Sequence, residues 1–241
     1  TFCWAELATS DPDAAKAFYA RVFGWEYRDD PIPGGSVYST ALRDGKAVAA
    51  LVGGHEQPPH WNSYVSVESV DETAARAREL GASLAAEPFD VMDIGRMAVL
   101  IDPIGAALCL WQPRTHIGAS YVNGPGALTW NDLITPDPAQ SARFYGDLFG
   151  WTTEEVEGGQ GYRVIYNRGR SNGGMMPAVG EMPPNWMPYF GHEDVDRLVG
   201  EIDGLGGRLF FGPMPLPSGR IAVVGDPQGA VFAVWTGNYD D

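Results

Sequence analysis

Apolar residues recur at helical spacing in one short segment near the start of the chain. Phe18 and Val22 lie four positions apart, on one face of a helix that this spacing predicts. Asp11 precedes this helix as a candidate N-cap, and Pro12 follows at the first helical position, where no backbone N–H is needed. Gly24 can end the helix in the left-handed conformation. We therefore predict a helix that begins after Asp11 and ends before Gly24.

The same segment occurs a second time, 126 positions later. Asp137 and Pro138 repeat the cap, Phe144 and Leu148 repeat the apolar face, and Gly150 repeats the stop. All eight tryptophans also fall into pairs, with spacings that drift from 126 to 124. The pairs are Trp4 with Trp130, Trp25 with Trp151, Trp61 with Trp186, and Trp111 with Trp235. Repetition of this kind indicates that a whole structural unit has been duplicated.

Alternating apolar and polar residues predict strands around these helices. Strands are predicted at residues 2–8, 36–42, 47–52, 61–67, 96–101, 106–111, 130–134, 186–191, 220–224 and 230–235. A capping box at Ser69 and Glu72 starts a further helix, which ends at Gly81, and its counterpart runs from Asp194 to Leu205. The order is β-α-β-β-β in each of four modules. Two similar domains follow, 1–113 and 127–241, joined by a linker with Gly and Pro at 114–126.

Composition narrows the set of partners. The formal net charge of −15 argues against nucleic acid and anionic membrane, because both need a basic surface. No apolar run approaches the roughly 20 residues that span a bilayer. The two cysteines, Cys3 and Cys109, show no disulfide or metal spacing and indicate a reducing compartment. We expect a cytoplasmic monomer or homodimer that binds a small molecule.

Short motifs near the end of each half complete the pattern. They are Gly95-Arg96 and Asp102-Pro103-Ile104-Gly105 with Cys109-Leu110-Trp111, and Gly219-Arg220 and Asp226-Pro227-Gln228-Gly229 with Ala233-Val234-Trp235. With the duplicated helices, these residues make the chain resemble the vicinal oxygen chelate superfamily, which includes glyoxalase I, bleomycin-resistance proteins and extradiol dioxygenases. The chain is most similar to two-domain actinobacterial glyoxalase-like proteins, some of which are encoded among antibiotic biosynthesis genes. The resemblance implies an α+β fold, with four βαβββ modules forming two cupped-sheet domains around cavities.

The resemblance also implies where a metal would bind, and the sequence departs from the family there. Metal-binding members place His, Gln or Glu on the first strand of a module and Glu on the last. The corresponding positions are Trp4, Asn62, Trp130, Met187, Cys109 and Ala233. No pair of these residues makes a plausible zinc or iron site. The histidines, His55, His60, His116 and His192, show no ligand spacing and are interpreted as solvated side chains. We therefore expect neither a metal nor another cofactor.

Strand alternation then selects the side chains that would line the cavities. The predicted catalytic residues are Glu6 and Asp132, one acid in each half, with Tyr64 and Tyr189 as hydrogen-bond donors. The predicted substrate-binding residues are Trp4, Asn62, Cys109, Trp111, Trp130, Met187 and Trp235. A carboxyl group among tryptophans is costly to ionise, so we expect the pKa of both acids to be raised toward a useful range.

Structural explanations compete with this interpretation. Duplicated tryptophans are common in cores, and we assign Trp25 and Trp151 wholly to packing. A structural role is equally consistent with Glu6 and Asp132, in which each acid binds a loop amide or an arginine such as Arg96 or Arg220. Cys109 is more typical of an inert buried thiol than of a nucleophile.

Three functions fit these residues. The favoured hypothesis is a metal-independent enzyme that acts on an aromatic, polyketide-like secondary metabolite by acid/base catalysis. Cyclisation, hydration or dehydration, and isomerisation are the reactions considered, which makes the enzyme a lyase or isomerase. The second hypothesis is a resistance protein that sequesters such a compound, and the third is a metal-dependent glyoxalase or dioxygenase. The fold alone does not distinguish them, because one scaffold hosts unrelated chemistries.

Overall fold

The duplicated helices form as their caps predict. The computed structural model describes residues 1–32, 35–54 and 58–239. In α1 (Pro12–Phe23) the carboxylate of Asp11 accepts a hydrogen bond from the Ala14 N–H at 3.0 Å, and Gly24 ends the helix at φ 68°. In α3 (Pro138–Phe149) Asp137 accepts from the Gln140 N–H at 2.8 Å, and Gly150 ends the helix at φ 73°. Capping and termination therefore follow from the sequence in both copies.

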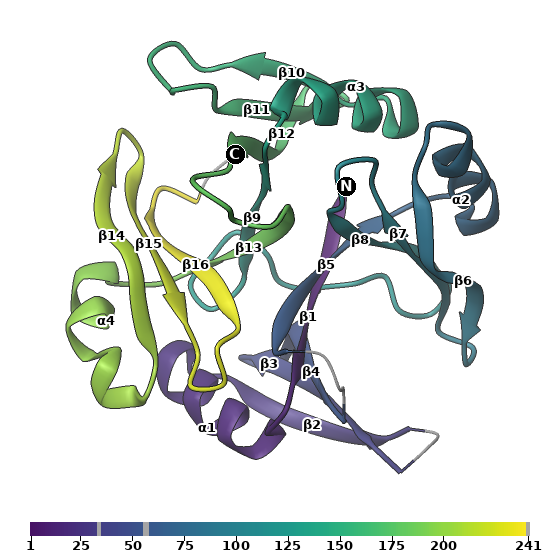
Figure 1. The fold of residues 1–241 in the computed structure, drawn as a ribbon. Coiled ribbons are helices and arrows are strands. Elements are labelled where there is room, and N and C mark those ends of the chain that lie inside the picture. The colour runs from purple at the N-terminus through teal and green to yellow at the C-terminus, as the bar shows by residue number, and fades with distance from the viewer. Residues whose placement is uncertain (33–34, 55–57, 240–241) are drawn as a thin grey trace. The chain divides into compact units, whose positions relative to one another are not determined.

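Each module contributes one helix and four strands (Figure 1). The first module has β1 (Phe2–Thr9), α1, β2 (Glu26–Pro31), β3 (Val37–Arg43) and β4 (Lys46–Gly53). The second has β5 (His60–Ser66), α2 (Val70–Glu79), β6 (Ser83–Val91), β7 (Gly95–Ile101) and β8 (Ala107–Pro113). The third has β9 (Leu128–Thr135), α3, β10 (Thr152–Glu155), β11 (Arg163–Asn167) and β12 (Arg170–Pro177). The fourth has β13 (Asn185–Gly191), α4 (Val195–Glu201), the short 3-10 helix Asp203–Leu205, β14 (Arg208–Leu216), β15 (Gly219–Gly225) and β16 (Val231–Gly237).

The strands form two eight-stranded sheets in the described part of the chain. Their orders are β2-β3-β4-β1-β5-β8-β7-β6 and β10-β11-β12-β9-β13-β16-β15-β14. The first strand of a module pairs in parallel with its last strand, so that Glu6 lies beside Ala50 and Asp132 beside Gly174. Neighbouring strands connected by hairpins are antiparallel. The predicted α+β fold of four βαβββ modules is confirmed. Within residues 1–32, 35–54 and 58–239, no helix is long and apolar enough to cross a bilayer.

Compact units cut across the two sheets. One unit contains Thr1–Cys3, Ser63–Ile117 and Trp130–Met187, and the other contains Trp4–Asn62, Gly118–Thr129 and Pro188–Asp241. We call them unit 1 and unit 2. The apolar core of unit 2 combines residues of the first and fourth modules, and the core of unit 1 is centred on the second and third modules. Hydrogen-bonded sheets thus join modules from the same half of the sequence, whereas each core joins modules from different halves.

A chain of three buried side chains crosses the core of unit 2. The indole N–H of Trp61 donates to the hydroxyl of Tyr19 at 3.1 Å, and this hydroxyl donates to Oδ2 of Asp226 at 3.1 Å. Asp226 Oδ1 accepts hydrogen bonds from the backbone N–H groups of Gln228 and Ala230. Burial raises the pKa of Asp226 and, together with the charge of that carboxylate, the pKa of Tyr19. The Asp-Pro turn of the fourth module is thereby bonded to the helix of the first.

Unit 1 contains the duplicate of this chain. Trp186 donates to Tyr145 at 2.9 Å, and Tyr145 donates to Oδ2 of Asp102 at 3.0 Å. Asp102 Oδ1 accepts from three successive backbone N–H groups, at residues 104–106. Trp25 and Trp151 lie in the two cores, as predicted, and stack on Tyr19 and Tyr145 respectively. The tyrosine of each Phe-Tyr pair is therefore a polar centre within an aromatic cluster.

Replacing Tyr19 or Tyr145 by Phe should destabilise the protein by about 1–3 kcal/mol each, because a buried carboxylate oxygen and an indole N–H lose their partner. Urea unfolding at pH 7 measures this loss. Tyr166→Phe is the matched control, since Tyr166 is half-buried on β11, and we expect a change within about 0.5 kcal/mol. A Tyr19→Phe variant as stable as the control would show that the bond to Asp226 contributes nothing.

The histidines are not all solvated, contrary to expectation. His192 is 8% exposed, and its Nδ1 accepts the backbone N–H of Asp194 at 3.0 Å, just before α4. Its ring also packs edge-on against Phe23. The predicted solvated state is therefore wrong for His192, because the chain uses this ring as an acceptor at a buried turn. His60 and His116 are half-buried, and His55 lies outside the described residues.

Burial, with a further contribution from Arg197, lowers the pKa of His192, although Glu193 acts in the opposite direction. The unfolded chain therefore binds the proton more readily than the folded one. Stability from this site is complete above the unfolded pKa of about 6.5 and is lost as the pH falls through the lower folded value. In His192→Asn an amide oxygen can still accept the N–H two residues on, and this variant does not titrate there. Urea unfolding between pH 7.5 and 5 should show a shallower loss for His192→Asn, and equal slopes would contradict the assignment.

Candidate functional site

Alternation along the first strands separates core residues from candidate site residues. Ala5 and Leu7 of β1 lie in the core of unit 2, and Leu133 of β9 lies in the core of unit 1. Successive side chains of a strand point to opposite faces. Glu6 and Asp132 therefore lie on the face of the sheet opposite to these core residues, as do Trp4 and Trp130.

Three polar groups meet on this face in the third module. The indole N–H of Trp130 donates to Oδ1 of Asp132 at 2.9 Å and to the hydroxyl of Tyr162 at 3.1 Å. The Tyr162 hydroxyl in turn donates to the same Oδ1 at 2.9 Å. Asp132 is 3% exposed, whereas Trp130 and Tyr162 are half-buried. We call Trp130, Asp132, Tyr162 and the neighbouring Gly174 the Asp132 cluster.

Gly174 makes room for this contact. It lies beside Asp132 in the parallel pairing of β9 with β12, and a Cβ atom there would overlap the Tyr162 hydroxyl and Asp132 Oδ1. The two donated hydrogen bonds hold Asp132 Oδ1 in position. Burial, followed by the charge of Asp132, raises the pKa of Tyr162 far above its ordinary value. Tyr162 thus remains a hydroxyl donor throughout the physiological range.

The first module carries a related arrangement in unit 2. The indole N–H of Trp4 donates to the hydroxyl of Tyr38 at 3.1 Å, and the half-buried Glu6 lies beside Ala50 in the sheet. Neither Tyr38 nor Tyr162 is among the residues predicted from strand alternation. A signal exists, because each tyrosine follows a Gly-Gly pair by three positions and the two lie 124 positions apart. The spacing equals that of the last tryptophan pair, so the repeat itself identifies them.

The other predicted site residues belong to further strands. Tyr64 of β5 lies beside Cys109 of β8 in unit 1, and both are buried. In unit 2, Tyr189 of β13 lies beside Ala233, and its carbonyl accepts a hydrogen bond from Thr129. Asn62 is half-buried, and Met187 is buried.

The tryptophans of the last strands have packing partners. Trp111 of β8 donates to the carbonyl of His116 at 2.8 Å. Trp235 of β16 packs edge-on against Tyr239, with ring centroids 4.7 Å apart. The arginines considered as partners for the acids bind elsewhere, since Arg96 pairs with Asp71 and Asp90, and Arg220 pairs with Asp196. Among the predicted residues, Trp130 and Asp132 meet in a polar cluster.

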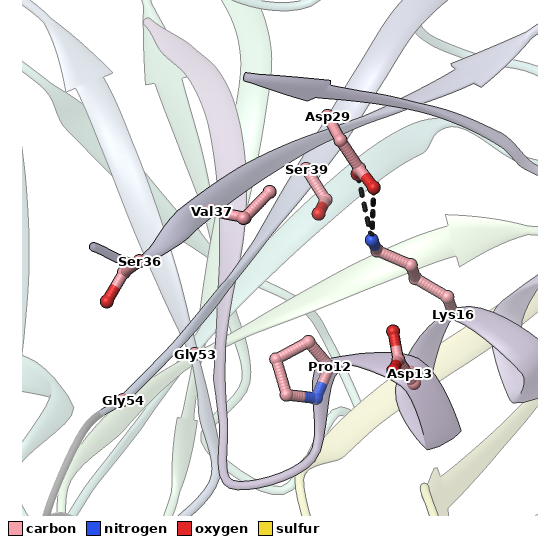
Figure 2. A pocket seen from close by; sticks show the side chains of 9 residues that line it. All are labelled: Pro12, Asp13, Lys16, Asp29, Ser36, Val37, Ser39, Gly53 and Gly54. Atoms are coloured by element: carbon pink, nitrogen blue, oxygen red, sulfur yellow. Dashed lines mark hydrogen bonds and ion pairs between the residues drawn. The ribbon is translucent and has the colours of Figure 1, made fainter. Parts of the chain in front are cut away.

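A separate depression of about 330 Å³ lies beside the start of α1 (Figure 2). Figure 2 shows Lys16 reaching from α1 to Asp29 on β2, with both carboxylate oxygens 2.8 Å from Nζ. Lys16, with a smaller contribution from Ser39, lowers the pKa of Asp29. Ala142 occupies the place of Lys16 in the duplicate, so this ion pair is confined to the first module. Because its cation is already neutralised, the depression is a weaker candidate than the Asp132 cluster.

Comparison with known proteins defines the class. The model of a glyoxalase-like domain matches residues 4–111. CFP32 of Mycobacterium tuberculosis, provisionally named a glyoxylase, is 42% identical over 96% of this chain and 92% of its own length. DauV of Streptomyces sp. (strain C5), named an anthracycline biosynthesis protein, is 30% identical over 96% of this chain and 91% of its own.

Solved structures show the same fold at low sequence identity. An extradiol ring-cleaving dioxygenase from B. fuscum aligns over 99% of this chain and 72% of its own, with a TM-score of 0.70 and 19% identity. A Mn(II)-bound glyoxalase from Novosphingobium aromaticivorans aligns over 100% of this chain and 84% of its own, with a TM-score of 0.68 and 18% identity. The fold is that of the vicinal oxygen chelate proteins. Within that class, the chain belongs to the glyoxalase-like family.

The side chains at the family's metal positions do not fit a divalent ion. An indole N–H is only a donor, and that of Trp130 is engaged with Asp132 and Tyr162. Met187 offers a thioether and Ala233 no donor atom, whereas Mn²⁺ prefers oxygen and imidazole ligands. In residues 1–32, 35–54 and 58–239, no group of three His, Cys, Asp or Glu side chains has an arrangement that could hold a metal. The residues at these positions therefore do not supply a set of metal ligands.

Divalent metal should neither stabilise nor activate the protein. A ligand present at a hundred times its dissociation constant stabilises a protein by about 2.7 kcal/mol. We expect no such shift in the melting temperature when MnCl₂ or ZnCl₂ is titrated in, and no change on treatment with a chelator. Untagged protein is required, since a histidine tag binds these ions. A saturable shift with one ion bound per chain would contradict the donor-set argument.

Proposed function

We propose that the protein binds a flat aromatic, polyketide-like metabolite and transfers a proton on it through Asp132, without a metal. The observation that carries this proposal is the Asp132 cluster, in which a buried carboxylate is oriented by an indole N–H and a phenol hydroxyl. The half-buried rings of Trp130 and Tyr162 offer apolar faces beside that carboxylate. Aromatic ligands stack on such rings, and a few polar groups then fix their orientation.

The chemistry requires only a proton acceptor with a fixed position. Asp132 would take a proton from a carbon or hydroxyl of the bound metabolite, leaving the electron pair on the metabolite. Returning the proton to a different atom completes an isomerisation. In a cyclisation the resulting carbanion attacks a carbonyl carbon, the C=O π electrons move to oxygen, and Asp132 returns its proton to the alkoxide. General acid/base catalysis of this kind contributes about 10²–10⁴-fold to a rate. No oxidant or reductant is consumed.

The named relatives support the choice of metabolite. DauV and DnrV, each 30% identical to this chain, are both called anthracycline biosynthesis proteins. Anthracyclines are fused-ring aromatic polyketides, which matches a site built from tryptophan and tyrosine. We infer by this similarity that the ligand is of the same chemical kind.

A sequestering protein is the second candidate. Two hydrogen bonds converge on one oxygen of Asp132 and fix its position, which would also suit a carboxylate that only orients a ligand. Such a protein would release the compound unchanged. It needs the same aromatic residues and the same fold.

Replacing Asp132 by Asn should lower turnover by about 10²–10⁴-fold while leaving ligand affinity nearly intact, because the amide keeps the shape and loses the proton acceptor. The substrate to use is an aromatic polyketide with an uncyclised β-ketone side chain, with products separated by chromatography and mass spectrometry. Glu6→Gln tests the duplicate acid in the same way. Tryptophan quenching gives the affinities.

Asp147→Asn is the matched control, since Asp147 is exposed on α3 of the same module, and its rate should equal that of the wild type. Full turnover in both Asp132→Asn and Glu6→Gln would rule out the proposed acid/base chemistry. Tight binding by the wild type with complete recovery of the compound would favour sequestration.

A further inference from the structure

The two copies of the acid site differ at the position beside the acid. Asp132 lies beside Gly174, and Glu6 lies beside Ala50 at the same register of the duplicated parallel pair. On the neighbouring antiparallel strand, Thr40 pairs with Ala50 and Val164 pairs with Gly174. Tyr38 and Tyr162 each lie two residues before the paired residue on that strand. The duplication is therefore aligned residue by residue around both acids, and the differences at these positions are substitutions rather than shifts of register.

Glycine at position 174 leaves space for neighbouring side chains and does not serve an unusual backbone conformation. Its φ lies outside the left-handed region, so an alanine there would meet no conformational penalty of that kind. A Cβ atom would instead overlap the Tyr162 hydroxyl and Asp132 Oδ1. In the first module the methyl group of Ala50 occupies the equivalent place, and Glu6 is longer than Asp132 by one methylene. The acid of the first module therefore lies on a longer side chain and beside a methyl group, an arrangement that differs from that of the third.

Resting on the function proposed above, we infer that the Asp132 cluster is the reactive copy and that its substrate is an enolisable β-dicarbonyl group on an aromatic metabolite. Tyr162 is a positioning residue, because its hydroxyl holds Asp132 Oδ1 at 2.9 Å and the ring leans over the strand where Gly174 leaves room. Gly174 is the residue that distinguishes this copy from the one that contains Glu6.

The base in this site is a carboxylate, which limits the C–H bonds that it can ionise. Two donors hold Oδ1 of this carboxylate in a fixed position. A carboxylate is a weak base, so it removes a proton most readily from an acidic carbon, such as a CH₂ group between two carbonyls. The C–H bond breaks, the proton goes to Asp132, and the electron pair becomes an enolate on the substrate. Protonation of the enolate at carbon restores Asp132.

Exchange of the central CH₂ protons of benzoylacetone into D₂O tests this inference without knowledge of the natural substrate. NMR follows the exchange rate above the buffer background between pH 4.5 and 7.5. The wild type should accelerate exchange, and Asp132→Asn should not. Tyr162→Phe and Gly174→Ala should each reduce the rate most strongly at the acidic end and move the acid limb of the pH profile upward, because the carboxylate loses a donor that favours its ionised form. The matched control Ala50→Gly should stay within about twofold of the wild type.

Each of the other outcomes contradicts one specific part of the inference or of the proposed function. No acceleration by wild-type protein that binds benzoylacetone overturns the β-dicarbonyl substrate class, while the function proposed above is judged on Asp132→Asn with a polyketide. Acceleration that survives in Asp132→Asn overturns both. If Asp132→Asn is inactive but Tyr162→Phe and Gly174→Ala keep the wild-type rate and pH profile, the positioning roles are wrong and the proposed function stands. A loss in Ala50→Gly as large as that in Gly174→Ala overturns the difference between copies. Should Gly174→Ala melt early, Tyr162→Phe alone decides the positioning role.

Discussion

Two buried carboxylates each join a pair of modules from different halves of the sequence. Asp226 and Asp102 each sit in an Asp-Pro turn, and each binds the hydroxyl of a tyrosine on the helix of a different module. Leaving such a carboxylate without partners inside an apolar core would cost several kcal/mol, so its backbone and tyrosine donors must be present together. The aromatic residues around Tyr19 and Tyr145 then pack on a fixed polar centre. Folding of one module is in this way coupled to the presence of its partner from the other half of the sequence.

This constraint also determines which side chains are available for chemistry. The cores take Ala5, Leu7 and Leu133 from the first strands, so the residues between them face away from the helices. Asp132 is among those residues, and its donors come from its own strand and from the residue before β11. Acids of two kinds result from one duplicated framework. Asp102 and Asp226 are bound by backbone amides and a buried tyrosine inside a core, whereas Asp132 is bound by two half-buried rings.

The sequence predicted those parts of the fold that local chemistry determines. The Asp caps, the glycine stops and the four-module order follow from short motifs and from the repeat. The strand β2 (Glu26–Pro31) did not, because its mostly charged residues do not alternate and its pairing with β3 comes from tertiary context. Tyr162 was overlooked for a related reason. Its contact with Asp132 joins residues 30 positions apart through the β9-β12-β11 pairing, which periodicity along one strand does not reveal. The buried role of His192 depends on tertiary packing in the same way.

Duplication explains why the two acids need not do the same work. A single module must keep the residues that build its core, and in both copies the capping, aromatic and Asp-Pro positions are retained. Residues on the face of the sheet opposite to the core do not build that core, so they are able to differ between the two copies. Glycine at 174 removes a side chain that the strand would otherwise use for packing, and the space it leaves is filled by a carboxylate oxygen and a hydroxyl. At the equivalent place Ala50 is fully buried and keeps its methyl group, so the space beside the acid is filled by the strand itself in the first module and by polar atoms in the third.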